Sequence, residues 1–141
     1  MRISTKGRYS LEALLHMAIL DGKALSVRAI AEAADISEAY LEQLFIPLRK
    51  AGIVRSIRGS DGGYVPGRAP DQITVGEVLR IMEGSLEITE CAKTTECLQS
   101  ADCMCREIWA ELYTAINDCV DSITLSDLAK AYGVMEKMEY I

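Results

Sequence analysis

The sequence contains no apolar run long enough to cross a membrane, because such a span needs about 18 consecutive apolar residues and every run in this chain is shorter. The first six residues, Met1 to Lys6, also lack the apolar stretch of a signal peptide. We therefore expect a cytoplasmic protein without a membrane partner. At 141 residues the chain has room for about one domain, which excludes a large multidomain enzyme.

Histidine is also scarce: His16 is the single one, and it lies far along the sequence from every cysteine. A cysteine–histidine hydrolase is therefore poorly supported. The sequence also lacks a serine–histidine–aspartate set, a phosphate-binding loop and a dinucleotide fingerprint. We expect that the chain is not an enzyme, and that His16 has a packing or surface role.

Charge is divided unevenly along the chain, although its net value is −6. Residues 1–70 carry ten Lys and Arg against seven Asp and Glu, whereas residues 71–141 carry five against fourteen. A polyanion such as DNA is attracted to the first half and repelled by the second. The acidic total therefore does not exclude nucleic acid as a partner.

Three serines, Ser4, Ser26 and Ser37, each precede a segment in which apolar residues recur at helical spacing, and each is expected to cap a helix. Pro47 lies inside the third segment, where it removes one helical hydrogen bond and clashes with the preceding turn. We therefore expect a kink or a break over residues 39–45. The three predicted helices cover residues 4–20, 26–35 and 37–52.

Two short strand-like segments follow, residues 53–57 and 63–65, and a glycine-rich turn with basic residues joins them. This pattern predicts a β-hairpin. Two short helices that lead to a third, followed directly by such a hairpin, have the order of a winged helix-turn-helix. The expected fold class is mainly α with a small β-hairpin wing, and residues 1–70 form its DNA-binding region.

The third predicted helix presents polar groups away from its apolar positions, and such groups can read base edges or hold phosphates. The hairpin adds arginines around glycines, which allow a close approach to the DNA backbone or the minor groove. Charged residues on one helix are often only a solvated face, but helix and wing together favour DNA binding. The helix contributes Ser37, Tyr40, Glu42, Gln43, Arg49 and Lys50, and the wing contributes Arg55, Arg58 and Arg68.

The second half of the chain is predicted to hold three helices and one long loop. A capping box opens a helix over residues 74–82, and residues 83–103 show no period, which indicates a loop. A long helix over residues 106–123 and a short one over residues 124–132 follow. We divide the chain into residues 1–70, a connecting helix with a cysteine-rich loop over 71–105, and a dimerisation helix with a tail over 106–141, all within one compact domain.

An apolar stripe runs along the predicted long helix. This face is broader than one small domain needs, so it either packs only on the N-terminal module or also joins a second copy of the chain as a dimerisation helix. We expect a homodimer. The stripe consists of Ile108, Leu112, Ile116, Cys119 and Ile123, with Trp109, Tyr113 and Val120 beside it.

Four cysteines lie in or just after the predicted loop: Cys91, Cys97, Cys103 and Cys105. Thiolates are soft ligands that suit zinc or an iron–sulfur cluster. The closely spaced pairs of structural zinc sites are absent, and longer spacers suit a cluster; thiols without a metal stay open as the alternative. Cys105 shares a centre with Cys103 only through an irregular turn, because residues two apart point to opposite sides. Cys119 is predicted to be a small buried core residue.

Several stretches of the sequence carry a resemblance to a known family. They are residues 1–9 (MRISTKGRY), 40–45 (YLEQLF), 48–54 (LRKAGIV), 58–64 (RGSDGGY) and three cysteines spaced C-x5-C-x5-C ahead of Trp109. On these stretches, residues 1 to about 130 resemble the IscR/NsrR/CymR family of bacterial transcription regulators. The resemblance implies a homodimer with a crossing dimer helix that binds double-stranded palindromic operator DNA, and it adds Arg2, Gly59, Gly62 and Tyr64 to the expected DNA contacts.

The resemblance also implies a ligand set, although the fourth ligand does not transfer. Arg106 stands where IscR-like members have a histidine ligand, and Arg8 stands where NsrR-like members have an acidic one. Cys105 is the nearest substitute, with Glu107 or a group from the partner chain as further options. The three cysteines that match the cluster ligands of the family are Cys91, Cys97 and Cys103.

We therefore predict a homodimeric, redox-sensing transcription regulator, a repressor, whose operator affinity is set by an iron–sulfur cluster of two or four irons. The predicted cofactor and metal ligands are Cys91, Cys97, Cys103 and Cys105. One alternative is a cluster-free regulator that senses through thiols or zinc. The other is a CymR-like regulator controlled by a protein partner, since CymR-like members lack the cluster and bind an enzyme of cysteine synthesis.

Overall fold

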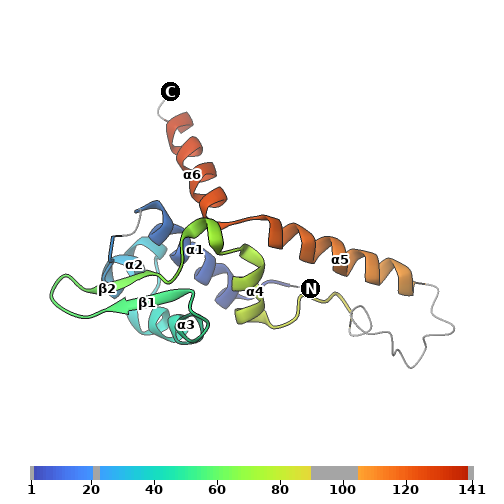
Figure 1. The fold of residues 1–141 in the computed structure, drawn as a ribbon, viewed down its shortest axis with the longest axis horizontal. Helices are drawn as coiled ribbons and strands as arrows, with labels where there is room; N and C mark the ends of the chain where they lie inside the picture. The colour runs from blue at the N-terminus through green and yellow to red at the C-terminus, as the bar shows by residue number, and fades with distance from the viewer. Residues whose placement is uncertain (1, 21–22, 90–104, 140–141) are drawn as a thin grey trace.

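The structure is a computed structural model, and it describes residues 2–20, 23–89 and 105–139. Figure 1 shows α1 to α4 and the hairpin gathered into one body, from which α5 and α6 project in different directions. The predicted fold class, mainly α with a β-hairpin wing, is confirmed. The elements are α1 (Thr5–Ile19), α2 (Val27–Ala34), α3 (Glu38–Lys50), β1 (Val54–Ile57), β2 (Gly63–Pro66), the 3-10 helix η1 (Pro70–Gln72), α4 (Val75–Glu83), α5 (Arg106–Ser122) and α6 (Leu125–Glu139).

Each of the first three helices begins after its predicted serine. Ser4, Ser26 and Ser37 have extended backbone, and their hydroxyl oxygens accept hydrogen bonds from backbone N–H groups of the first helical turn at 3.1 to 3.4 Å. Such caps satisfy N–H groups that have no partner within a helix. Asp35 ends α2 with left-handed backbone (φ 55°), and the chain turns there into α3, as in a helix-turn-helix.

The third helix is continuous across Pro47, so of the kink or break expected over residues 39–45 the break is wrong. Proline lacks the N–H that would have bonded the carbonyl oxygen of Gln43. Gln43 lies on the exposed side of α3, so this oxygen can bond water instead. The helix ends as predicted, with Gly52 in the left-handed region (φ 77°) just after it. Four buried side chains hold α3 on both sides of the proline: Leu41, Leu44, Phe45 and Leu48.

The hairpin forms as predicted. Its strands pair antiparallel, with Val54 opposite Pro66. On the other edge of β2, the backbone of Tyr64 exchanges hydrogen bonds with that of Leu25 at 2.7 and 3.0 Å. A side chain on Gly63 would collide with the backbone of Leu25, and Gly63 has φ 149°. Glycine at this position therefore allows the wing to lie against the segment that leads into α2.

The core lies where α1, α2, α3, the hairpin and α4 meet. Each large apolar side chain that is fully buried there contributes about 1.5–3 kcal/mol. Leu125, the first residue of α6, belongs to the same cluster and is fully buried, so the core also fixes the start of α6. The largest buried members are Leu14, Met17, Ile30, Leu41, Phe45, Leu48, Ile53, Ile73 and Leu125.

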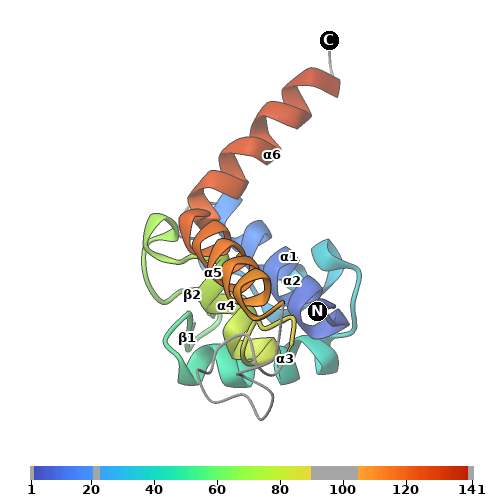
Figure 2. The same ribbon diagram turned by 90° about the vertical axis from the view of Figure 1, so that its right-hand side faces the viewer.

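The fourth helix opens with the predicted capping box, in which Thr74 and Glu77 each accept a hydrogen bond from the other's backbone N–H at 3.1 Å. The long helix α5 agrees with its predicted range. Figures 1 and 2 show it leaving the body beside α4, and none of its residues is buried in the single chain. Cys119 is exposed there, so the prediction of a buried core residue is wrong for the single chain.

The last helix is longer than the sequence predicted. Thr124 and Asp127 exchange hydrogen bonds at 3.0 and 3.1 Å at its start, but α6 continues to Glu139 rather than ending near Tyr132. Gly133 disfavours a helix by only about 1 kcal/mol, which is too little to stop it. No helix within the described ranges is long and apolar enough to span a membrane.

Candidate nucleic-acid interface

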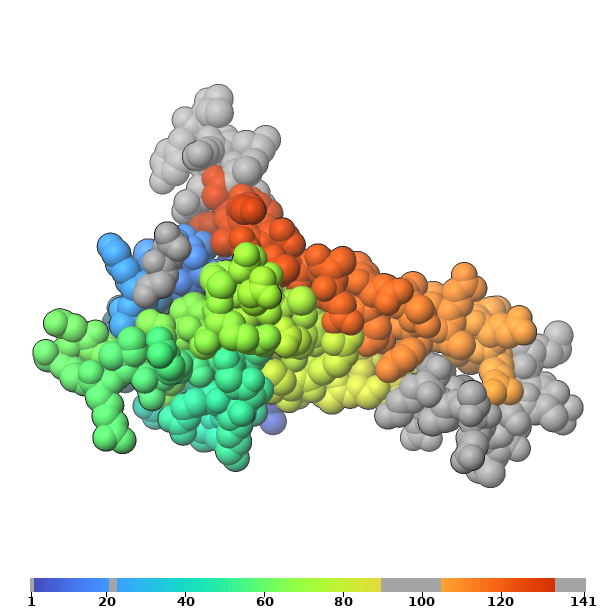
Figure 3. Space-filling model, viewed as in Figure 1, coloured from blue at the N-terminus to red at the C-terminus, as the bar shows by residue number. Residues whose placement is uncertain are grey.

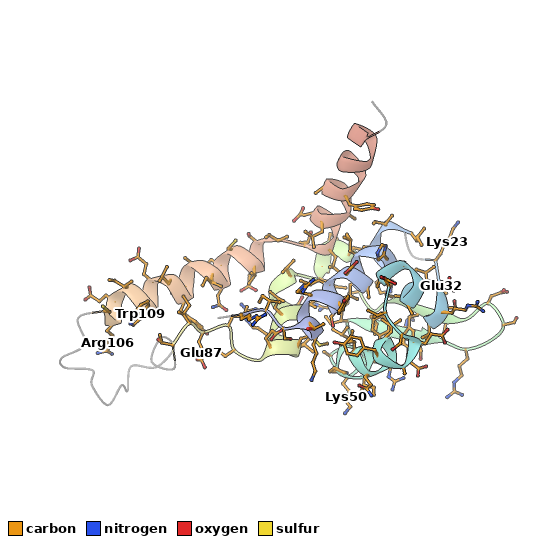
Figure 4. All side chains as sticks on the ribbon, turned by 180° about the vertical axis from the view of Figure 1, so that it is seen from behind. Lys23, Glu32, Lys50, Glu87, Arg106 and Trp109 are labelled. Carbon is orange, nitrogen blue, oxygen red and sulfur yellow. The ribbon has the colours of Figure 1, made fainter. Side chains whose placement is uncertain are left out.

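The exposed face of α3 carries the residues predicted to read bases. Glu42, Gln43 and Arg49 are exposed, as is Ser37 at the N-cap. The Ser37 hydroxyl accepts a hydrogen bond from the backbone N–H of Tyr40 at 3.1 Å, and it can still donate to a phosphate. Figure 4 shows Lys50 projecting away from the body at the end of this helix. Carboxylate, amide and guanidinium groups on one helix suit the major groove.

The first turns of α1 lie beside this face. The ring of Tyr40 is half-buried and meets the ring of Tyr9 edge to face, with 6.0 Å between the ring centroids. Lys6 lines the same hollow of about 290 Å³ as Tyr40 and Gln43. Arg2 is exposed just before α1. Sequence reasoning missed Lys6, because its charge is visible in the sequence but nothing there places it next to α3.

The turn of the wing presents Arg58 and two glycines with different roles. Gly59 is exposed and has φ 114°, in the left-handed region that favours glycine. The backbone N–H of Gly62 bonds the carbonyl oxygen of Gly59 at 3.0 Å, and a side chain on Gly62 would collide with the backbone of Ile57. The two glycines therefore fold a tight turn and leave Arg58 exposed at its start.

Tyr64 has a packing position in the wing. Its ring meets Phe45 edge to face at 4.8 Å between centroids, and its backbone is paired with Leu25. The ring therefore holds the wing against α3, and its contact with DNA stays a prediction.

Two arginines of the wing region differ in their partners. Arg68 binds Glu77 with 2.8 Å between nitrogen and oxygen. Burial raises the pKa of Glu77, but hydrogen bonds from Arg68 and from the Thr74 backbone outweigh it and leave the pKa below its usual 4.5. Glu77 is therefore ionised at neutral pH, and a DNA phosphate would have to compete with its carboxylate for Arg68. Arg58 forms no ion pair with any described residue, and the same holds for Arg49 and Arg55.

The apolar stripe of α5 is partly exposed, most of all in its first half. Ile108 is 51% exposed and Leu112 is 40% exposed, while only Val120 and Ile123 at the other end pack against the small cluster around α4. Figure 3 shows α5 as an arm that extends away from the body. Among the described residues, the α4 cluster therefore packs against Val120 and Ile123, while Ile108 and Leu112 stay exposed.

Of the predicted cluster ligands, the structure describes Cys105 alone; Cys91, Cys97 and Cys103 lie outside the described residues. Cys105 is a free, exposed cysteine at the N-cap of α5, and its side chain makes no capping hydrogen bond. A thiol in this position suits the soft donor set of an iron–sulfur cluster. Within the described part of the chain, no group of three or more His, Cys, Asp or Glu could hold a metal ion.

Comparison with known proteins gives consistent matches. A model of the Rrf2 family, described as iron-dependent transcriptional regulator, matches residues 3–131. The chain is 44% identical to the transcriptional regulator CymR of Bacillus subtilis over 92% of this chain and 90% of CymR. It is 36% identical to IscR of Sodalis glossinidius over 99% of this chain and 85% of IscR. Among solved structures, CymR of B. subtilis superposes with a TM-score of 0.81 at 42% identity, covering 93% of this chain and 98% of CymR.

The fold, in which α3 has an exposed face and is followed in the chain by a hairpin wing, is that of a winged helix-turn-helix regulator. The chain belongs to the Rrf2 family of transcriptional regulators. Its relatives are named as regulators, which confirms the prediction that it is not an enzyme.

Proposed function

We propose that this chain is a homodimeric regulator that binds palindromic operator DNA through α3 and the wing. The observation that carries the proposal is the set of exposed arginines without an ion-pair partner among the described residues: Arg49 at the end of α3, and Arg55 and Arg58 in the hairpin. They lie in the half of the chain that has net positive charge. Arginines in this arrangement neutralise phosphates and release counterions, which supplies much of the affinity for DNA.

The second copy of the chain is the partner that fits the uncovered stripe of α5. Ile108 and Leu112 are exposed on it, and an apolar stripe on a projecting helix is covered when two such helices pack together. A twofold dimer places two copies of α3 in related positions, which matches a palindromic site.

The signal is proposed to enter through an iron–sulfur cluster held by Cys91, Cys97 and Cys103, with Cys105 as the fourth ligand. When bound, such a cluster supplies a centre that changes with redox state or iron supply. Cys105 stands at the tip of α5, so a change at the cysteines would act on the helix that joins the two copies. Each state of the cluster then favours one arrangement of the two DNA-binding modules, and the free energy of DNA binding differs between these arrangements.

A cluster-free regulator that senses through thiols is the second candidate. It is favoured by the 44% identity to CymR and by a solved structure described as an oxidized form of Staphylococcus aureus CymR, 37% identical to this chain. Arg106 and Arg8 at the two positions where relatives have a fourth ligand also favour it.

Two measurements test these proposals. Selection of duplexes from a random library by the purified protein, followed by a mobility-shift assay, should yield a palindromic site bound by a dimer. Failure to enrich any duplex would overturn DNA binding. Anaerobic purification with iron and acid-labile sulfide analysis then separates the two sensing modes: stoichiometric iron and sulfide support the cluster, whereas their absence with a thiol-dependent change in DNA affinity supports the second candidate.

A further inference from the structure

The start of α1 is fastened to the end of α4 by one carboxylate. Glu83 accepts a hydrogen bond from the backbone N–H of Ser4 at 3.0 Å and another from the Ser4 hydroxyl at 2.5 Å. The two residues are 79 positions apart in the sequence, so this joint is a tertiary contact. Ser4 is also the N-cap of α1.

The joint is closely built. A side chain on Gly7 would collide with the carboxylate of Glu83, which therefore lies directly against the first turn of α1. That turn contains no acidic residue of its own. Because a negative charge is stabilised at the N-terminus of a helix, Glu83 supplies from α4 the charge that α1 lacks.

An apolar cluster joins the same two segments. Leu86, three residues after Glu83, is only 2% exposed and packs with Val75 and Leu79 of α4. Ile3, next to Ser4, packs against this cluster. Leu86 stands five positions before Cys91, so the lead-in to the cysteine-bearing segment and the start of the chain share one small core.

The first turns of α1 in turn contact the reading helix. Tyr9 meets Tyr40 of α3, and Lys6 shares a hollow with Gln43 and with Met82, the neighbour of Glu83. A contiguous series of contacts therefore runs from the lead-in of the cysteine-bearing segment, through the joint, to the exposed face of α3.

We propose that Glu83 is a positioning residue for operator binding, and that its joint with Ser4 passes a change in the cysteine-bearing segment to α3. The inference rests on the proposed function. Glu83 itself does not contact DNA. It holds the start of α1 in place, so that Arg2 and Lys6 contact DNA phosphates while α3 lies in the major groove. Without the joint, the phosphate contacts and the groove contacts are no longer made together.

Two substitutions separate this role from a simple effect of charge. Removal of a negative charge near a polyanion should by itself strengthen binding to DNA. Glu83→Ala should instead weaken it about tenfold and lower the slope of log affinity against log salt by about 1, because a phosphate contact is lost. Glu83→Gln keeps an oxygen that can accept both hydrogen bonds, so its affinity should stay within about threefold of wild type.

Glu12→Ala is the matched control, because it removes an exposed carboxylate two turns further along α1. This variant should bind DNA as tightly as wild type or more tightly. The probe is a fluorescent duplex selected by the wild-type protein, and affinity is measured by anisotropy in two cysteine states. These are the cluster-bound and cluster-free protein if the iron analysis finds a cluster, and the reduced and oxidised thiols if it does not. In Glu83→Ala the ratio of affinities between these two states should fall toward one.

Glu83→Ala that binds like Glu12→Ala, with an unchanged salt slope, overturns the inference. If Glu83→Ala does not fold by circular dichroism, Ser4→Ala takes its place, because it removes the hydroxyl bond and keeps the backbone one; wild-type affinity and state ratio in Ser4→Ala overturn the inference equally. A wild-type protein that binds no duplex overturns the proposed function itself. If the DNA affinity of wild type differs between the two cysteine states and that of Glu83→Ala differs by the same ratio, only the proposed role of the joint is overturned.

Discussion

The guanidinium of Arg80 in α4 donates two hydrogen bonds to the carboxylate of Asp121 in α5, with nitrogen–oxygen distances of 2.7 and 2.9 Å. The same group donates to the side-chain oxygen of Asn117 at 2.6 and 3.3 Å. Gly76 leaves room for this arrangement, because a side chain there would collide with the Asp121 carboxylate. These polar contacts, together with the packing of Val120 and Ile123 against the cluster around α4, hold the C-terminal end of α5 against α4.

The first prediction concerns the pH dependence of this contact. The hydrogen bond from Arg80 lowers the pKa of Asp121 below its usual 3.8. A pKa that is lower in the folded chain stabilises the fold above pH 3.8, and this stabilisation is lost as the pH falls toward the folded pKa. Asp121→Asn should therefore lower the free energy of unfolding at neutral pH by less than about 1 kcal/mol, since the pair is partly exposed.

Urea denaturation at about pH 7 and about pH 3 checks this prediction. The difference between wild type and Asp121→Asn should shrink at the lower pH. Asp118→Asn, which alters an exposed carboxylate of α5 that forms no ion pair with Arg80, is the control and should show little difference at either pH. An Asp121→Asn effect that grows in acid would contradict the sign.

The second prediction concerns the dimer. Ile116 lies near the middle of the stripe of α5, so Ile116→Asp would place an unpaired charge in a dry interface and weaken the dimer by several kcal/mol. Sedimentation velocity should show a monomer or an aggregate. Thr114→Asp adds the same charge to an exposed position off the stripe and should leave the dimer intact. A well-folded Ile116→Asp dimer of unchanged affinity would mean that the stripe packs only within the chain.

The third prediction compares two glycines of the wing. Gly63→Ala should lower the free energy of unfolding by about 2 kcal/mol or more, because its backbone is strained for alanine and its side chain would collide with Leu25. Gly59→Ala has the same kind of strain (φ 114°) but nothing within 4 Å of the new atom, so it should cost only about 1 kcal/mol. Equal melting temperatures for the two variants would show that the contact with Leu25 is loose.

Signals in the local sequence were enough to predict most of the fold. Ser4, Ser26 and Ser37 cap their helices as expected, and the box of Thr74 and Glu77 opens α4. These features depend on residues within one turn of each other, so they can be read without knowledge of the tertiary structure. The arginines of the candidate interface were found in the same way.

Features that depend on distant residues were missed. The joint of Glu83 with Ser4 and the place of Lys6 beside α3 arise only when α1 packs between α3 and α4. The prediction that the last helix ends near Tyr132 was wrong, because α6 continues through Gly133 to Glu139. Cys119 was read as core because its stripe is apolar, but that stripe is uncovered in the single chain.

The fourth prediction concerns the wing. Arg58 is exposed at the start of the turn and forms no ion pair with a described residue. If it reaches a base edge or a narrow groove, Arg58→Ala should weaken operator binding by about 1–3 kcal/mol. Lys130→Ala removes an exposed charge from α6 and should leave the affinity unchanged. Wild-type affinity in Arg58→Ala, measured by anisotropy at the same salt concentration, would remove the wing from the interface.

The last prediction concerns the cysteines. Single removal of Cys91, Cys97 or Cys103 should abolish or severely reduce the iron and sulfide content, because an incomplete set of protein thiolates holds a cluster poorly. Cys105→Ala is the discriminating variant. If Cys105 is a ligand, its loss should give a labile cluster with an altered absorption spectrum; if it is a nearby resolving thiol, the cluster should persist while oxidative disulfide formation changes.

Cys119→Ala is the matched control for Cys105→Ala, because it removes the other exposed cysteine that the structure describes, further along α5. Its iron content and spectrum should equal those of wild type. Arg106→His in the Cys105→Ala background puts an imidazole at the position of the IscR-like ligand, and exchange of a thiolate for a neutral imidazole should raise the reduction potential, since imidazole donates less charge to iron. An unchanged spectrum and potential in both variants would exclude Cys105 and point to Glu107 or to a group from the second copy of the chain.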